Sequence, residues 1–148
     1  MRTLTALLAG PAPALIALDS LRAAEPPTYP IGGRYGLAAH KRGPSLEAAK
    51  DVIDDATREC TDTGRWFDFK GNVRVDHFTG RPLTFTLKHV QFTPPDTYYL
   101  VEGEHIGDSF ILHKSSEAMI DIVMTDGASV YIQLWMVNCG SIRASPTK

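Results

Sequence analysis

The chain has 148 residues, of which 43% are hydrophobic and 22% charged, and its formal net charge at neutral pH is −2. This length is typical of a single domain that can bury a modest core. The only adjacent basic residues are Lys41 and Arg42. The sequence therefore lacks the basic patch on which nucleic-acid binding depends, and we expect no nucleic-acid partner.

Residues 1–24 have the layout of a secretory signal peptide, because Arg2 precedes an uncharged apolar run over 4–18. The run is shorter than the roughly 20 residues that a membrane-spanning helix needs, so we expect no membrane span. Cleavage is predicted after Ala24, although Arg22 stands where a small residue is preferred. The arginines also fit a mitochondrial presequence. We expect export, and hence a secreted or periplasmic protein.

Residues 25–44 are dense in glycine and proline, including the pairs Pro26-Pro27 and Gly32-Gly33. Such residues interrupt helices and strands. We therefore predict an irregular arm over 25–44, followed by a single domain at 45–140 and a flexible tail at 141–148.

The spacing of apolar residues after Pro44 predicts an amphipathic helix of about four turns. Ser45 is suited to cap its start, since its side chain can accept a hydrogen bond from the first free amides. The apolar positions recur at helical spacing in a narrow stripe. They are Leu46, Ala49, Val52, Ile53, Ala56 and Cys60. Because Cys60 lies on this stripe, we expect its thiol to face the surface on which the helix packs.

From residue 65 onward the apolar pattern changes to the alternation typical of strands. The predicted strands are 65–69, 72–78, 83–92, 98–104, 108–114, 118–125 and 128–138. Short turns separate them, and Asp126-Gly127 is the clearest hairpin signal. Short connections favour an antiparallel meander over parallel βαβ units. The predicted fold class is therefore α+β, with one N-terminal amphipathic helix packed on a curved antiparallel sheet of six or seven strands.

Cys60 and Cys139 are the two cysteines of the chain. In an oxidising compartment they are predicted to form a disulfide bond. Closing a loop of about 80 residues stabilises a domain by roughly 4–5 kcal/mol in the chain-entropy model. The alternative is a reactive or metal-binding pair, but neither a CxxC motif nor a neighbouring histidine supports it.

Two predicted strands, 108–114 and 128–138, are apolar on both faces, so we expect both to be covered on both sides. One helix with a narrow stripe covers only one face of the sheet. The 25–44 arm, or closure of the sheet into a half-barrel, would cover the other. Alternatively, that face is an apolar pocket or a surface for a protein partner. Its candidate lining residues are Tyr98, Tyr99, Phe110, Tyr131 and Trp135.

Polar residues that could carry catalysis are few. Asp76, His77 and His89 are candidate acid–base residues, although the preferred interpretation of either histidine is a group at the edge of the core. Glu104, His105 and Asp108 could approach one cation if their hairpin curls, or they form a solvated hairpin tip. The sequence contains no recognised zinc, calcium or phosphate motif, so neither a metal nor a cofactor is expected.

Two functions follow from these patterns. The preferred hypothesis is an exported, non-enzymatic binding module that holds an apolar ligand or a protein partner on one sheet face, as small inhibitors and immunity proteins do. The alternative is a small hydrolase or isomerase with an Asp/His pair in a cone-shaped pocket. A purely structural subunit would leave no chemical signal in the sequence. Polar side chains that converge inside a cavity would favour the enzyme, and purely apolar walls the binding module.

Overall fold

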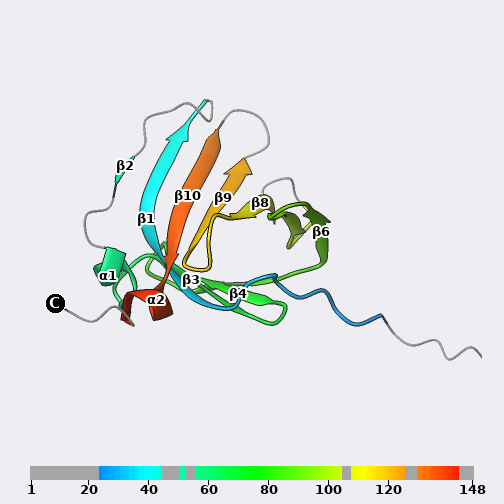
Figure 1. Cartoon of the computed structure of the whole chain (residues 1–148), viewed down its shortest axis with the longest axis horizontal. Helices are drawn as coiled ribbons and strands as arrows, with labels where there is room; N and C mark the ends of the chain where they lie inside the picture. The colour runs from blue at the N-terminus through cyan, green and yellow to red at the C-terminus, as the bar shows by residue number, and fades with distance from the viewer. Residues whose placement is uncertain (1–23, 45–50, 53–55, 105–107, 126–129, 144–148) are drawn as a thin grey trace, which may run out of the picture.

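The computed structural model of the chain describes residues 24–44, 51–52, 56–104, 108–125 and 130–143 (Figure 1). Ten strands lie in these residues: β1 (Gly33–Gly43), β2 (Asp51–Val52), β3 (Trp66–Lys70), β4 (Val73–Asp76), β5 (Leu83–Thr86), β6 (His89–Thr93), β7 (Thr97–Val101), β8 (Ser109–Lys114), β9 (Met119–Thr125) and β10 (Tyr131–Asn138). The two helices of the described part are short: α1 (Ala56–Glu59) and α2 (Cys139–Arg143).

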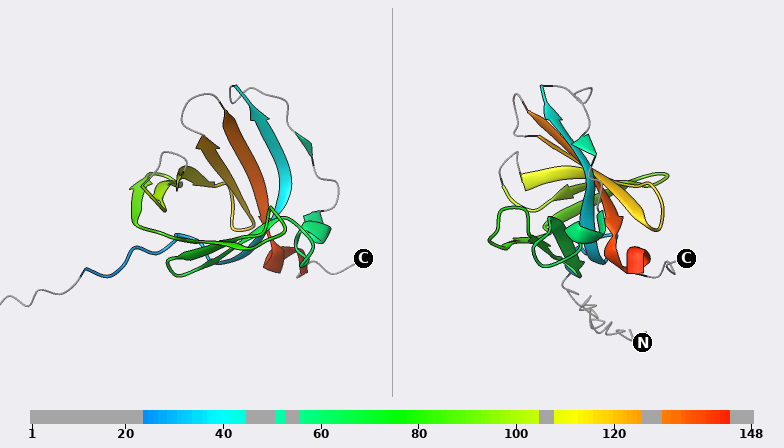
Figure 2. Two further views of the ribbon diagram at one scale, coloured as in Figure 1. Left: turned by 180° about the vertical axis from the view of Figure 1, so that it is seen from behind. Right: turned by 90° about the vertical axis from the view of Figure 1, so that its left-hand side faces the viewer.

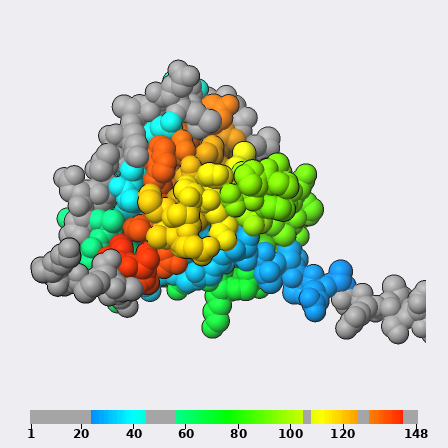
Figure 3. All heavy atoms as spheres, in the orientation of Figure 1, coloured from blue at the N-terminus to red at the C-terminus, as the bar shows by residue number. Residues whose placement is uncertain are grey.

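The strands form one antiparallel sheet that curls into a half-barrel (Figures 1 and 2). Nine of them follow the order β5-β4-β3-β1-β10-β9-β8-β7-β6, and β2 pairs beside β1. The two outer arms of the sheet are meanders of consecutive strands, joined in the middle by the pairing of β1 with β10. In the space-filling view the yellow and orange strands β8, β9 and β10 form one continuous surface beside the green segment that precedes them (Figure 3).

Strand alternation places the core on the concave face of the half-barrel. Phe110 and Leu112 of β8 are buried, whereas Ile111 and His113 between and after them are exposed. The same two-residue alternation buries Leu134 and Met136 of β10. The buried core cluster consists of Tyr29, Tyr35, Leu37, Phe67, Phe69, Leu87, Leu100, Phe110, Leu112, Ile120, Ile122, Leu134 and Met136. The half-barrel covers only the concave face of β8 and β10. The expectation that both strands are covered on both sides is wrong, because Ile111 and Tyr131 on the other face are 44% and 41% exposed.

The predicted α+β class is wrong, because the described chain is mostly sheet. The expected four-turn helix is replaced by β2 and the single turn of α1, with residues 45–50 and 53–55 outside the described part. The physical reason lies in the pattern itself. The apolar stripe is narrow and its acidic neighbours, such as Asp51, are weak helix formers, whereas β1 offers Asp51–Val52 an open edge with which to pair.

The 25–44 segment also differs from its prediction as an irregular arm, since β1 lies at the centre of the sheet. The glycines of β1 are compatible with the strand and do not interrupt it. Gly33 begins β1 with φ of 90°, a conformation that glycine adopts without strain. A Cβ at Gly36 would lie 2.8 Å from Cys60 Sγ, so this glycine lets the end of α1 approach the strand.

The strands predicted after residue 65 are confirmed as an antiparallel meander, with one exception. The predicted strand 83–92 is divided into β5 and β6, which lie at opposite edges of the sheet. The division falls at Leu87 and Lys88. The Leu87 amide donates to Asn72 O at 2.8 Å, and the Lys88 amide donates to Val101 O at 2.8 Å. Adjacent residues therefore bond to different arms of the half-barrel.

The predicted disulfide bond between Cys60 and Cys139 is confirmed, with Cα atoms 5.6 Å apart. Both cysteines are buried. The bond links the residue after α1 to the first residue of α2, next to β1.

Candidate functional site

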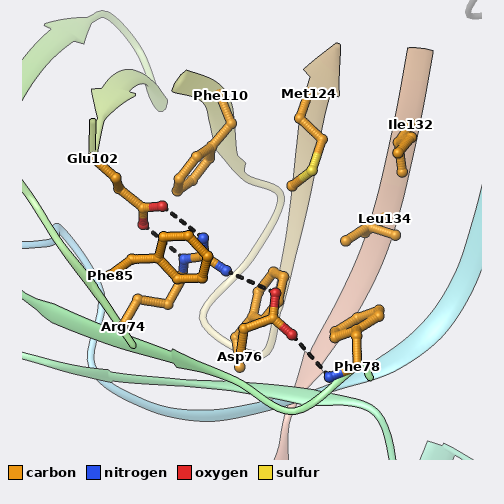
Figure 4. A pocket seen from close by; sticks show the side chains of 10 residues that line it. Arg74, Asp76, Phe78, Phe85, Glu102, Phe110, Met124, Ile132 and Leu134 are labelled. Atoms are coloured by element: carbon orange, nitrogen blue, oxygen red, sulfur yellow. Dashed lines mark hydrogen bonds and ion pairs between the residues drawn. The ribbon is translucent and has the colours of Figure 1, made fainter. Parts of the chain in front are cut away.

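A pocket of about 230 Å³ opens on the concave face of the half-barrel, between the two arms of the sheet (Figure 4). Most of its wall is apolar, and this part is formed by Phe67, Phe78, Phe85, Phe110, Met124, Ile132 and Leu134. Three ionisable side chains complete the lining: Arg74 and Asp76 from β4, and Glu102, which directly follows β7. The pocket is therefore amphipathic, with its charged groups gathered at one side (Figure 4).

Strand geometry explains why these charges meet. Arg74 and Asp76 are two residues apart on β4, so their side chains leave the same face of the strand. Glu102 comes from the other arm of the half-barrel. The Glu102 amide donates to Asp108 O at 2.8 Å, which fixes its backbone beside the start of β8.

Arg74 and Glu102 form a buried ion pair. Arg74 Nε donates to Glu102 Oε1 at 2.7 Å, and Nη2 donates to Oε2 at 2.6 Å. The side chains are only 5% and 2% exposed, respectively. The Tyr29 hydroxyl also donates to Glu102 Oε1. Both carboxylate oxygens of Glu102 are thus held by protein donors, and such charge-assisted bonds are the stronger kind.

Three phenylalanine rings surround the guanidinium of Arg74. Its Cζ atom lies 4.5 Å from the centroid of Phe67, 4.3 Å from that of Phe85 and 5.5 Å from that of Phe110. These distances are within the range in which the negative face of an aromatic ring attracts a cation. The rings therefore offset part of the cost of burying this charge.

The surroundings keep both hydrogen-bond donors of the cluster protonated. Burial lowers the pKa of Arg74, but the hydrogen bonds and charge of Glu102 oppose it and raise the pKa above its ordinary value. Burial, followed by the hydrogen bond and charge of Glu102, raises the pKa of Tyr29 well above its ordinary value of 10.0. Arg74 and Tyr29 therefore keep the protons that they donate to Glu102.

Asp76 is the more accessible of the two carboxylates in the pocket, with a side chain 18% exposed. Its Oδ1 accepts the Phe78 backbone N–H at 2.8 Å. Its Oδ2 lies 3.4 Å from Arg74 Nη1, a long contact compared with those that Glu102 makes. Asp76 therefore faces the pocket with less of its bonding capacity used than Glu102.

The three predicted acid–base candidates are not brought together. Asp76 lines the pocket, but His77 points to the opposite side of the sheet, where its ring stacks on Trp66 with centroids 3.5 Å apart. His89 is exposed at the start of the edge strand β6. Neither histidine lines the pocket.

The five predicted binding residues divide between the two faces of the sheet. Phe110 lines the concave pocket, and Tyr98 packs against the same core. Tyr99 and Tyr131 are exposed on the convex face and line a second hollow of about 150 Å³, which Phe110 and Met124 also border. Trp135 is also on the convex face, since it alternates with buried residues of β10. Tyr98 and Tyr99 could not share one surface, because they are adjacent on a strand.

Sequence reasoning missed Arg74, Glu102 and Tyr29. On β4, Val73 and Val75 are half-buried and Arg74 between them is buried, the reverse of what their polarity would indicate. The available signal was the opposite charge of two residues, one in an apolar strand and one directly after an apolar strand. Nothing local links them, since they are 28 positions apart.

No group of three His, Cys, Asp or Glu side chains within the described ranges is arranged to hold a metal ion. His105, one member of the predicted cation site, lies outside those ranges. Of the two helices described, neither has the length and apolar character needed to cross a bilayer. Comparison with models of known protein families, with curated proteins and with solved structures finds no match in any of the three.

Proposed function

We propose that this protein is an exported, non-enzymatic binding module that holds a small amphipathic ligand in the concave pocket. The observation that carries the proposal is the composition of that pocket, an apolar wall with charged groups gathered at one side. Small-molecule sites are typically built in this way, with apolar walls for affinity and a few polar groups for orientation.

The size of the pocket limits the ligand. A volume of 230 Å³ corresponds to roughly eight water molecules at the density of the liquid. We therefore expect a ligand of about eight non-hydrogen atoms, or one end of a longer molecule that reaches out of the pocket.

The buried disulfide bond supports export. Such bonds persist in oxidising compartments and are rare in reducing ones. Together with the apolar leader of the sequence, it favours a secreted or periplasmic location.

The enzyme hypothesis keeps one supporting observation, because polar side chains do converge inside the cavity. Their contacts favour binding over catalysis. A general acid or base needs freedom to exchange a proton with a substrate. Both oxygens of Glu102 are held by Arg74, and the candidate histidines lie outside the pocket. Asp76 lines the pocket, but neither predicted histidine partner lies beside it there.

A tryptophan that fills the pocket should abolish binding. Met124 lines the concave pocket and also borders the second hollow, whereas Ile111 is exposed on the convex face and lines the second hollow alone. We expect Met124→Trp to weaken binding at least tenfold by occupying ligand volume, and Ile111→Trp, the control for the second hollow, to bind as the wild type does. The measurement is isothermal titration with three six-carbon probes: 1-hexanol, hexylammonium and hexanoate.

Saturable one-to-one binding of at least one probe, lost in Met124→Trp alone, would support the proposal. The proposal fails if no probe binds the wild type at millimolar concentration, or if the two tryptophan variants bind equally well. Native mass spectrometry of protein purified from its own host provides an independent check, since a retained ligand would appear as added mass.

A further inference from the structure

The charges that line the pocket do not balance. The formal charges of Arg74, Asp76 and Glu102 sum to −1. Arg74 and Glu102 neutralise each other through two bonds of 2.7 and 2.6 Å. The negative charge that remains is that of Asp76, at the side of the pocket where the polar groups gather (Figure 4).

Asp76 also has unused bonding capacity. A carboxylate offers about four lone-pair positions. Among the described residues, one oxygen of Asp76 accepts from Phe78 N–H and the other has the 3.4 Å contact with Arg74. Asp76 can therefore accept further hydrogen bonds from a donor that enters the pocket.

The walls next to Asp76 favour a cation as well. Four phenylalanines contribute to the lining, and two of them, Phe67 and Phe78, lie with ring centroids 4.8 Å apart. Aromatic faces carry negative potential and attract ammonium groups, more strongly where water is excluded. Phe78 is the lining phenylalanine that is not among the three rings around Arg74. An anion in the pocket would be repelled by the aromatic faces and by the charges of Asp76 and Glu102. Arg74, the cation of the lining, is already paired with Glu102.

We propose that the pocket selects a small organic cation, a primary ammonium group on an apolar body, and that Asp76 receives the ammonium while the phenylalanine and aliphatic walls hold the body. This inference rests on the proposed binding function of the pocket. The ammonium donates to Asp76, and the buried Arg74–Glu102 pair holds the wall of rings in place without contributing net charge.

The test uses the same six-carbon probes, which differ only in the head group. We expect hexylammonium to bind about 10- to 100-fold more tightly than 1-hexanol, the range that a hydrogen bond to a charged group contributes, and hexanoate to bind more weakly than both. Asp76→Asn should remove the advantage of hexylammonium over 1-hexanol. The asparagine oxygen can still accept the Phe78 N–H, so the variant keeps this local bond.

Asp62→Asn is the matched control. It removes the same charge at an exposed position, where Asp62 pairs with Arg34 at 3.3 Å. Circular dichroism shows whether each variant is folded. The inference is overturned if hexanoate or 1-hexanol binds the wild type as tightly as hexylammonium, or if Asp76→Asn keeps the advantage of hexylammonium. In either case binding of the other probes would leave the proposed function standing. The wild-type ranking alone decides the question if Asp76→Asn does not fold.

Discussion

At the scale of single residues, the buried pair of Arg74 and Glu102 is the feature with the largest energetic consequence. A buried ion pair contributes little net stability compared with apolar residues of the same size, because both charges lose their water. Removing one partner is costly, since it leaves the other charge buried and unpaired. The pair is therefore better understood as a device that fixes the shape of the pocket than as a source of stability.

We expect Arg74→Met to lower the free energy of unfolding by about 3–5 kcal/mol, because Glu102 is left without its counter-charge. The double variant Arg74→Met/Glu102→Gln should recover most of this loss, since no buried charge remains and the glutamine oxygen can still accept from Tyr29. Urea unfolding of the two single variants, the double variant and the wild type measures the coupling. Additive losses in the double variant would contradict this account.

The absence of Arg74 and Glu102 from the sequence-based site has a physical reason. Sequence patterns show which residues share a face of one strand, but a buried charge is stable only through a partner that the fold supplies. Here the partner lies on the opposite arm of the half-barrel. Asp76 and Phe110 were identified because each lies in a strand whose alternation of apolar and polar residues can be recognised in the sequence.

At the scale of elements, α1 is held by its last residue. Glu59 Oε2 accepts the Arg65 backbone N–H at 2.7 Å and Arg65 Nε at 3.1 Å, which closes the turn between α1 and β3. The hydrogen bond from the Arg65 side chain lowers the pKa of Glu59 below its ordinary value of 4.5. A single helical turn has little stability of its own, so this clamp and the disulfide bond keep α1 in place.

Glu59→Gln should lower the free energy of unfolding by about 1–2 kcal/mol at pH 7, because the charge-assisted bonds are lost. The sign of the pH dependence follows from the lowered pKa. The contribution is present above the ordinary pKa of 4.5 and is lost as the pH falls through the lower folded value. The wild-type and Glu59→Gln unfolding curves should therefore converge as the pH drops below 4.5. An equal difference at pH 7 and at acid pH would exclude this role.

The elements that sequence reasoning predicted best are those with local signals. The strands after residue 65 alternate clearly and are separated by turn residues, and their antiparallel order follows from short connections. The prediction of a four-turn helix was wrong because the spacing of apolar residues is a local signal. It does not show that the edge of β1 is available to pair with Asp51 and Val52. The sequence did not predict β1 because glycine and proline are frequent in and before it, and both usually interrupt strands. Here Gly33 adopts a positive φ and Gly36 allows the close approach of Cys60.

At the scale of the whole molecule, the disulfide bond closes a loop of 79 positions that contains every strand from β3 to β10. The double variant Cys60→Ala/Cys139→Ala should lose about 4.5 kcal/mol in the chain-entropy model. Thermal unfolding with and without a reducing agent provides the measurement: the reductant should destabilise the wild type and leave the variant unchanged. Equal stability of the variant and of the wild type without reductant would contradict a stabilising disulfide bond.

β1 and β10 come from nearly opposite ends of the described chain, yet they are neighbours, with Tyr35 opposite Asn138 and Gly43 opposite Tyr131. During translation the ribosome delivers β1 before, and β10 after, the other strands of the sheet from β3 to β9. Until β10 emerges, the nascent polypeptide consists of two separate meanders, and β1 keeps an open edge of the kind that recruits strands from other molecules. A message that ends before codon 131 would therefore yield two unjoined half-sheets prone to aggregation, however well each one forms.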